Sequence, residues 1–350
     1  MKTVKEVLIT LYSEILESYR NKNELCILRN SMTFYEFIEK QFEKYRKLCS
    51  EIKEEEIVEL LEDQGKICLF KGKYTKKRFL NLQKIIVDSV LNILQVAYKG
   101  DFYTACTELN SLMKGQRKIN EYLVEGLQDY INIINLSKDS TFYRMRNKEK
   151  DTGAPNDCSH VPFTSRYKAS FQRYNMSGIP CLYLANSKET ADREIGQLAN
   201  NKDRWCGEFK SRKSISVLDL SAPTQESIEK ETHLNTLLGW LLTYPLRLPC
   251  VIKVGNKGNF CEEYIFPQLM FHWMYILPED KRGNGFMYSS TQNPGGINYV
   301  FPAKYEGKKP PTLKDKQVST ELEKLFEASE PKLYKKGKEK KKYTIEITEL

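Results

Sequence analysis

The first 137 residues carry hydrophobic side chains at the spacing of amphipathic helices almost without a break. Apolar residues three and four positions apart fall on one side of a helix, so this spacing predicts helices. The most regular run covers residues 82–98, and Gly100 follows it at the position of a helix C-cap. Further helices are predicted at 4–19, 34–45, 57–61, 105–113 and 119–134. The first proline is Pro155, so we expect an all-helical domain packed as a bundle.

Beyond Thr141 the pattern changes to short apolar runs separated by prolines, glycines and further helical stretches. Short apolar runs bounded by turn residues predict strands. The predicted strands are 141–146, 181–185, 215–220, 250–254, 285–289 and 298–301, and the predicted helices are 188–198, 233–243 and 262–276. We therefore expect an α+β protein with a helical domain at 1–138, a mixed α/β domain at 139–310 and a basic tail at 311–350. Alternating residues at 343–348 predict an edge strand in that tail.

Positive charge is in moderate excess: 55 Lys and Arg face 46 Asp and Glu, a formal net charge of +9 in 350 residues. Much of this excess lies in two lysine-rich runs, at 71–78 and 332–342. Such runs are able to contact phosphates, so a non-catalytic nucleic-acid-binding protein remains an alternative. They contain only two tyrosines, too few for a platform on which bases stack. No apolar run reaches the ~20 residues of a membrane helix, so we expect no membrane partner.

The nine cysteines form no CxxC pair, which argues against a zinc knuckle and a thioredoxin-type redox site. The three histidines show no metal-binding spacing, so no metal is expected. Residues 1–20 lack the apolar core of a signal peptide. Unpaired thiols without such a leader predict a cytoplasmic protein.

Arg144 is one of four residues whose chemistry suggests a binding site. It lies in the apolar run TFYRMR, where a guanidinium is costly unless it meets an anion or a carboxylate. Three further residues follow on a loop, a strand and the next helix: Arg173, Tyr183 and Glu194. Together these side chains are able to surround a ligand that carries both a phosphate and an aromatic ring. An ion pair, a core tyrosine and surface charges are the ordinary structural alternatives.

Ser289 and Ser290 end the predicted strand 285–289, where a hydroxyl can reach a ligand. Serines at such positions are also common turn residues. No GxSxG motif surrounds them, which argues against an acyl-transfer nucleophile.

The order of these segments resembles the RES domain family between about residues 141 and 305. The segments that carry the resemblance are FYRMR, the arginine and glycine turn before CLYLA, ETADREIG, EEYIFPQLMFHW and FMYSSTQNPGGINYVFP. The resemblance implies Arg144, Glu194 and Ser290 as catalytic residues, with Ser289 as the alternative serine. It also implies a fold similar to ADP-ribosyltransferases and a bacterial toxin, or an antiviral defence effector, that degrades NAD.

NAD is then the substrate, no further cofactor is needed, and inorganic phosphate is a possible co-substrate. Cleavage of the nicotinamide–ribose bond passes through an oxocarbenium-like state, which the carboxylate of Glu194 is suited to stabilise. Arg144 and Arg173 suit the pyrophosphate, Tyr183 suits the nicotinamide ring, and Ser290 suits a ribose hydroxyl. Transfer of ADP-ribose to a protein is an alternative. The helical domain is expected to regulate the enzyme or to bind an antitoxin or a second copy.

Overall fold

The computed structural model describes residues 1–20, 32–62, 75–115, 126–147, 158–195, 203–254, 261–278, 282–312 and 318–335. The predicted strand at 343–348 lies outside these residues. Of the two lysine-rich runs, only 75–78 and 332–335 are described, and of the predicted helix 119–134 only the part from 126 onward.

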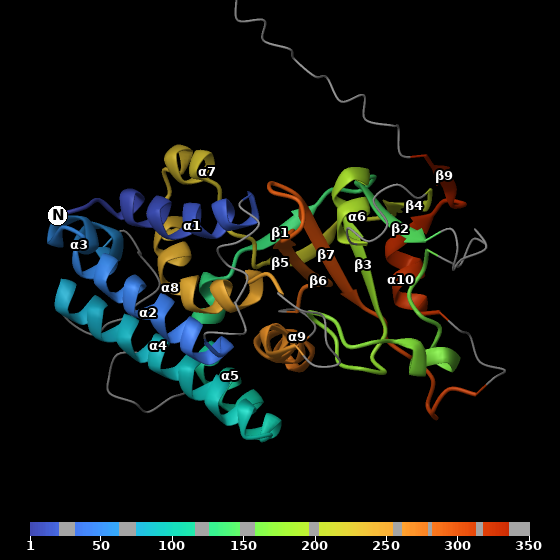
Figure 1. Cartoon of the computed structure of the whole chain (residues 1–350), viewed down its shortest axis with the longest axis horizontal. Helices are drawn as coiled ribbons and strands as arrows, with labels where there is room; N and C mark the ends of the chain where they lie inside the picture. Colours follow the sequence, from blue (N-terminus) through green and yellow to red (C-terminus); the bar gives the residue numbers. More distant parts are fainter. Residues whose placement is uncertain are drawn as a thin grey trace, which may run out of the picture.

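The N-terminal region forms a layer of helices on one side of the molecule (Figure 1). Their bounds are α1 Val4–Arg20, α2 Phe34–Ser50, α3 Glu54–Glu62, α4 Lys76–Tyr98 and α5 Phe102–Lys114. Local chemistry explains their ends: Thr33 and Glu36 form a capping box at the start of α2, and Gly115 closes α5 in the left-handed conformation.

Helix α4 is the one described helix that is long and apolar enough to cross a membrane by length and composition alone. Half of its most apolar window is buried inside the protein, and α4 packs on α2, α5 and α8. These contacts are those of a core helix.

A mixed sheet follows, in the order β1-β5-β6-β7-β3-β2-β4-β8, with β9 paired to β4. The strands are β1 Ile133–Leu136, β2 Thr141–Asn147, β3 Cys181–Ala185, β4 Arg204–Ser211, β5 Ile215–Asp219, β6 Gly285–Ser289, β7 Ile297–Pro302, β8 Phe326–Ala328 and β9 Lys332–Tyr334. Neighbouring described strands are antiparallel except β5 and β6. The α+β class predicted from the sequence is confirmed.

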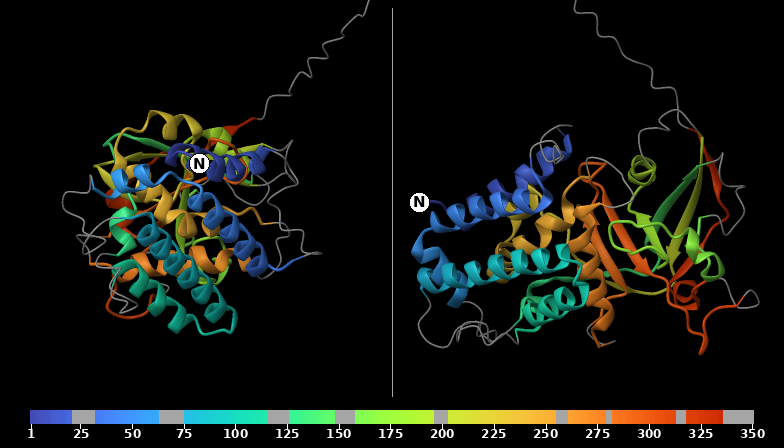
Figure 2. Two further views of the ribbon diagram at one scale, coloured as in Figure 1. Left: turned by 90° about the vertical axis from the view of Figure 1, so that its left-hand side faces the viewer. Right: turned by 60° about the horizontal axis from the view of Figure 1, so that its bottom comes forward.

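The connections between strands carry the remaining helices. These are η1 Leu127–Tyr130, η2 Phe163–Lys168, α6 Lys188–Glu194, α7 Gln225–Lys230, α8 Leu234–Val251, η4 Glu262–Tyr264, α9 Ile265–Ile276 and α10 Thr320–Leu325. Helices α8 and α9 lie between the N-terminal helices and the sheet (Figures 1 and 2). They share one continuous hydrophobic core with α1–α5.

The predicted strand at 250–254 is wrong, because Cys250 and Val251 are the last residues of α8. Helix α8 also continues past the predicted end at residue 243, although it contains Pro245 and Pro249 and a proline removes a helical N–H donor. The carbonyl that Pro245 leaves without a donor belongs to Leu241. It accepts a hydrogen bond from the Tyr45 hydroxyl of α2 at 2.8 Å, so a neighbouring helix replaces the lost donor.

The predicted continuation of a helix to residue 134 is also wrong. Gly126 passes so close to the end of α5 that a Cβ there would lie 1.8 Å from the carbonyl oxygen of Met113. After one turn of η1 the chain becomes β1, which pairs with β5. The sheet therefore begins before residue 139, where the second domain was predicted to start.

Candidate functional site

A cavity of about 450 Å³ lies against β2, β3 and α6, closed by the loop 170–173 and by η4. Cavities that bind small molecules typically enclose roughly 300–1,000 Å³. Four of the six predicted site residues line it: Arg144, Arg173, Tyr183 and Glu194. Ser289 and Ser290 do not line the cavity, although the Ser290 hydroxyl donates a hydrogen bond to Glu194, which does.

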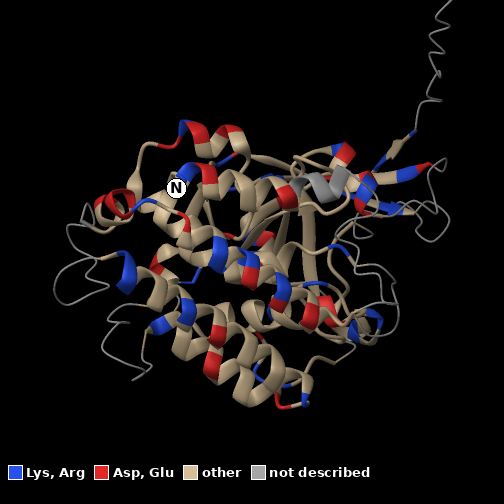
Figure 3. Cartoon of the chain, turned by 60° about the vertical axis from the view of Figure 1, so that its left-hand side comes forward, with Lys and Arg blue, Asp and Glu red and all other residues tan. Residues whose placement is uncertain are grey.

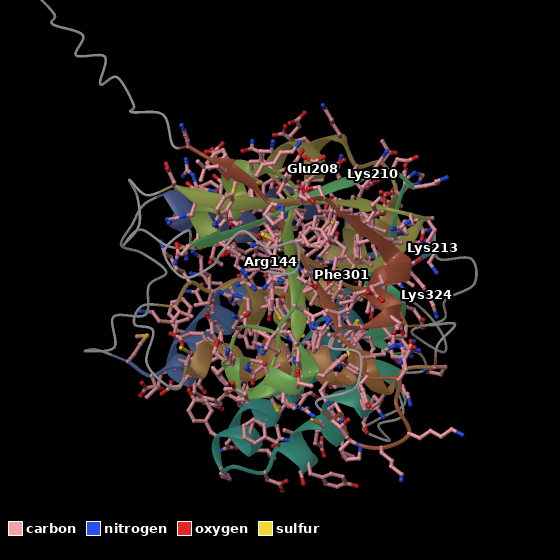
Figure 4. All side chains as sticks on the ribbon, turned by 90° about the vertical axis from the view of Figure 1, so that its right-hand side faces the viewer. Arg144, Glu208, Lys210, Lys213, Phe301 and Lys324 are labelled. Atoms are coloured by element: carbon pink, nitrogen blue, oxygen red, sulfur yellow. The ribbon has the colours of Figure 1, made fainter. Side chains whose placement is uncertain are left out.

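The side chain of Arg144 lines the cavity, and one of its nitrogens has no hydrogen-bond partner among the described residues. It comes from β2, and its Nη1 is buried without a hydrogen bond to any described residue. Burial, with repulsion from Arg146, lowers the pKa of Arg144 well below its usual range. In Figure 4 Arg144 lies near the middle of the view, with the exposed Lys210 and Lys213 toward its edge. A half-buried guanidinium whose Nη1 lacks a hydrogen bond among the described residues and that lines a cavity is suited to bind an anion.

Arg173 is held in place from two sides and is 8% exposed. Its Nη1 donates to the carbonyl oxygen of Cys250 at 3.0 Å. That carbonyl lies in the last turn of α8, where backbone oxygens lack helical donors and favour a cation. The guanidinium also lies 5.3 Å from the centre of the Tyr264 ring, within the range of a cation–π contact.

Glu194 ends α6, and two side chains orient its carboxylate. Its Oε1 accepts hydrogen bonds from the Ser290 hydroxyl and from the Asn298 amide, each at 2.6 Å. Helix α6 is itself anchored to the sheet, because Asp192 forms a buried ion pair with Arg204 of β4 at 3.4 Å. The carboxylate is thus fixed at the cavity wall by charge-assisted hydrogen bonds.

The two candidate serines have different partners. Ser290, 1% exposed, donates to Glu194 and accepts from the backbone N–H groups of Gln292 and Asn293. The Ser289 hydroxyl accepts from the backbone N–H of Ala222. Ser290 is therefore the serine that the structure connects to the cavity, through Glu194.

Tyr183 lines the cavity from β3, and its hydroxyl holds the loop that carries Arg173. The hydroxyl donates to Asn175 Oδ1 at 2.8 Å and accepts from the Tyr174 backbone N–H at 3.2 Å. Its role in stacking on a nicotinamide ring stays a prediction.

The sequence interpretation missed several residues at this site. Asn298 is buried in β7, and an amide within the apolar run INYVF is a signal for a satisfied polar contact. Phe171 and Tyr264 line the cavity beside Arg173 with ring centres 5.7 Å apart. Nothing in the local pattern marks these two aromatic residues as different from core residues.

Two other expectations concern metals and nucleic acid. Within the described residues, no group of three or more His, Cys, Asp and Glu side chains is placed to hold a metal ion. Lys and Arg are interspersed with Asp and Glu over the helices that face the viewer in Figure 3. The described part of that face is therefore not a continuous basic surface for phosphates.

Comparison with known proteins adds a family. The chain matches the RES domain model over residues 141–316. Over 172 residues it is 28% identical to a protein of Bacillus subtilis (strain 168) named "Putative toxin YopC". The aligned region covers 46% of this chain and 39% of that protein. The chain thus spans well under half the length of this relative.

Among solved structures, the M. tuberculosis MbcT-MbcA toxin-antitoxin complex has a TM-score of 0.31 and 14% identity, covering 58% of this chain and 88% of that one. The RES domain match spans half of the chain and contains all six predicted site residues. The chain belongs to the RES domain family.

Proposed function

We propose that this protein cleaves the bond between nicotinamide and ribose in NAD. The observation that carries the proposal is one cavity lined both by Arg144, whose Nη1 has no hydrogen-bond partner among the described residues, and by the oriented carboxylate of Glu194. A ligand that fits this arrangement has an anionic part and, at some distance, a centre that becomes positive during the reaction. NAD has both, in its pyrophosphate and in the ribose carbon that bears nicotinamide.

The proposed reaction needs little from the protein beyond position and charge. The bond from the ribose C1′ to the nicotinamide nitrogen breaks, and its electron pair leaves with neutral nicotinamide. An oxygen of water or of inorganic phosphate bonds to C1′; water also loses one proton to solvent. Glu194 stabilises the oxocarbenium-like state between these events.

Recognition of the substrate is assigned to the arginines and the aromatic residues. Arg144 and Arg173 bind the pyrophosphate, because a guanidinium offers paired donors to phosphate oxygens. Phe171 and Tyr264 present rings beside Arg173, and Tyr183 presents a third at the cavity wall. These rings are suited to stack on the bases of the dinucleotide.

Action as a cytoplasmic toxin is part of the same proposal. It is supported by the name of the Bacillus subtilis relative, which describes a toxin. Depletion of NAD would explain toxicity, and an antitoxin or a second copy of the chain would be the natural restraint.

The test is incubation of the purified protein with NAD, with and without inorganic phosphate, followed by separation of the products. Free ADP-ribose indicates hydrolysis, and ADP-ribose 1″-phosphate that forms only with phosphate indicates phosphorolysis. Label from NAD that stays on a protein indicates ADP-ribosyl transfer. If NAD is not consumed under any of these conditions, the proposal is wrong.

A further inference from the structure

The guanidinium of Arg173 is held by elements that pack against the N-terminal helices. The carbonyl that accepts its hydrogen bond belongs to Cys250, in the last turn of α8, and the ring that it contacts belongs to Tyr264, the last residue of η4. Helix α9 continues from η4 and holds the loop itself: the Gln268 amide donates to the carbonyls of Gln172 at 2.8 Å and Asn175 at 3.1 Å. We call Arg173, Phe171 and Tyr264 the arginine wall.

Helix α8 depends in turn on the N-terminal helices. The Tyr45 hydroxyl of α2 donates a hydrogen bond to the carbonyl oxygen of Leu241. The Tyr12 hydroxyl of α1 donates to the carbonyl oxygen of Trp240 at 2.8 Å. Tyr244 of α8 stacks on Tyr45, with ring centres 5.0 Å apart. These contacts are buried and fix the axis of the helix whose last turn receives Arg173.

A second connection reaches the arginine wall directly through Glu262. This residue begins η4, two positions before Tyr264. Its Oε2 accepts a hydrogen bond from the Tyr98 hydroxyl at the end of α4, at 2.5 Å, and from the backbone N–H of Phe34 at 3.3 Å. Phe34 is the first residue of α2, where a helix favours a negative charge.

The carboxylate of Glu194 is held by the other part of the molecule. Its partners Ser290 and Asn298 come from the end of β6 and from β7, and its helix is anchored to β4. The Glu194 side of the cavity is thus attached to the sheet, whereas the loop with Arg173 is attached both to the sheet, through Tyr183, and to helices that pack on the N-terminal helices.

We propose that the N-terminal helices position the arginine wall, with Tyr98 and Glu262 as positioning residues for substrate binding. The inference rests on the proposed function for its kinetic readout. Arg173 contacts the pyrophosphate equally before and during bond cleavage, so displacing it weakens binding without slowing the chemical step. Damage at the Tyr98–Glu262 contact therefore raises KM for NAD and leaves kcat unchanged.

The experiment compares Tyr98→Phe with wild type in the full chain. The variant keeps the ring and loses the hydrogen bond to Glu262, and we expect a rise in KM of roughly fivefold, since one hydrogen bond is worth about 1 kcal/mol. Tyr103→Phe is the matched control, because this tyrosine of α5 is 84% exposed and should leave KM unchanged. Glu262→Gln keeps an acceptor oxygen and should stay within twofold of wild type, whereas Glu262→Ala should match Tyr98→Phe.

Amide hydrogen exchange provides a readout that does not need NAD. In Tyr98→Phe we expect faster exchange in residues 170–178 and 262–264, and no change in β2 and β4. Unchanged exchange in those segments overturns the inference, and so does faster exchange with an unchanged KM. If wild type consumes no NAD, the proposed function fails, and exchange alone then decides whether the helices position the wall.

Discussion

Replacing Ser290 or Ser289 with alanine separates two neighbouring hydroxyls that have different partners. Ser290→Ala removes the donor to Glu194 and the acceptor for the backbone N–H groups of Gln292 and Asn293. Ser289→Ala removes only the acceptor for the backbone N–H of Ala222. Both changes create a similar small defect in a buried region, but only the first releases the carboxylate at the cavity.

The expected magnitudes follow from these contacts. A hydrogen bond to a charged group contributes about 1.5–3 kcal/mol, so Ser290→Ala should lower kcat about 10- to 150-fold if the full amount is lost in the transition state. KM for NAD should change little, because the arginines are untouched. Ser290→Ala also removes the acceptor of two part-buried N–H groups, and Ser289→Ala removes the acceptor of one buried N–H, so each variant should lower the free energy of unfolding by about 1–3 kcal/mol.

Steady-state NAD consumption and thermal unfolding of both variants are the measurements. We expect similar losses of stability in the two proteins and a loss of kcat in Ser290→Ala alone. Equal kcat values in the two folded variants would refute the assignment of Ser290 as the residue that orients Glu194.

Three further outcomes are expected. Arg144→Gln should raise KM for NAD about tenfold or more without lowering the melting temperature, since it removes a half-buried charge whose Nη1 has no hydrogen-bond partner among the described residues; an unchanged KM would contradict this. A fragment of residues 140–350 should fail to unfold cooperatively in calorimetry, because it exposes the buried surface of α8; a sharp transition would show that the N-terminal helices are dispensable. Burial lowers the pKa of His160, whose neutral ring accepts from the Ser319 backbone N–H. Stability should thus be full above about pH 6.5 and fall as pH drops below it; His160→Gln should flatten this melting profile, and the exposed His272→Gln should not.

The sequence was sufficient to predict most elements that frame the cavity. Strands β2, β3 and β6 lie at or within a residue of their predicted positions, because short apolar runs between turn residues have few other structures open to them. The order of the arginines and Glu194 along these elements also predicted which side chains meet at the cavity.

What the sequence did not show depends on contacts between distant segments. Strand β4 was missed because Gly207, Glu208 and Lys210 weaken its pattern. The glycine is explained only by packing, since a Cβ there would lie 2.5 Å from the Cβ of Cys158. Likewise, Tyr45 satisfies the carbonyl that Pro245 exposes, a contact across almost two hundred residues that local rules cannot anticipate.

Glu194 is the residue through which the proposed chemistry acts, and Glu189 offers a control on the same helix. Glu189 is exposed and pairs only with Arg193 among the described residues, so Glu189→Gln removes an equal charge from α6 without touching the cavity. Glu194→Gln keeps the size of the side chain and one acceptor oxygen but loses the negative charge.

The decisive measurement is the turnover of NAD by wild type, Glu189→Gln and Glu194→Gln under identical conditions. Loss of one preorganised electrostatic contact to the transition state typically costs about 10²–10³-fold in kcat. We therefore predict that wild type and Glu189→Gln consume NAD at similar rates and that Glu194→Gln is slower by about that factor, with KM little changed. A folded Glu194→Gln protein that cleaves NAD at the wild-type rate would contradict the account.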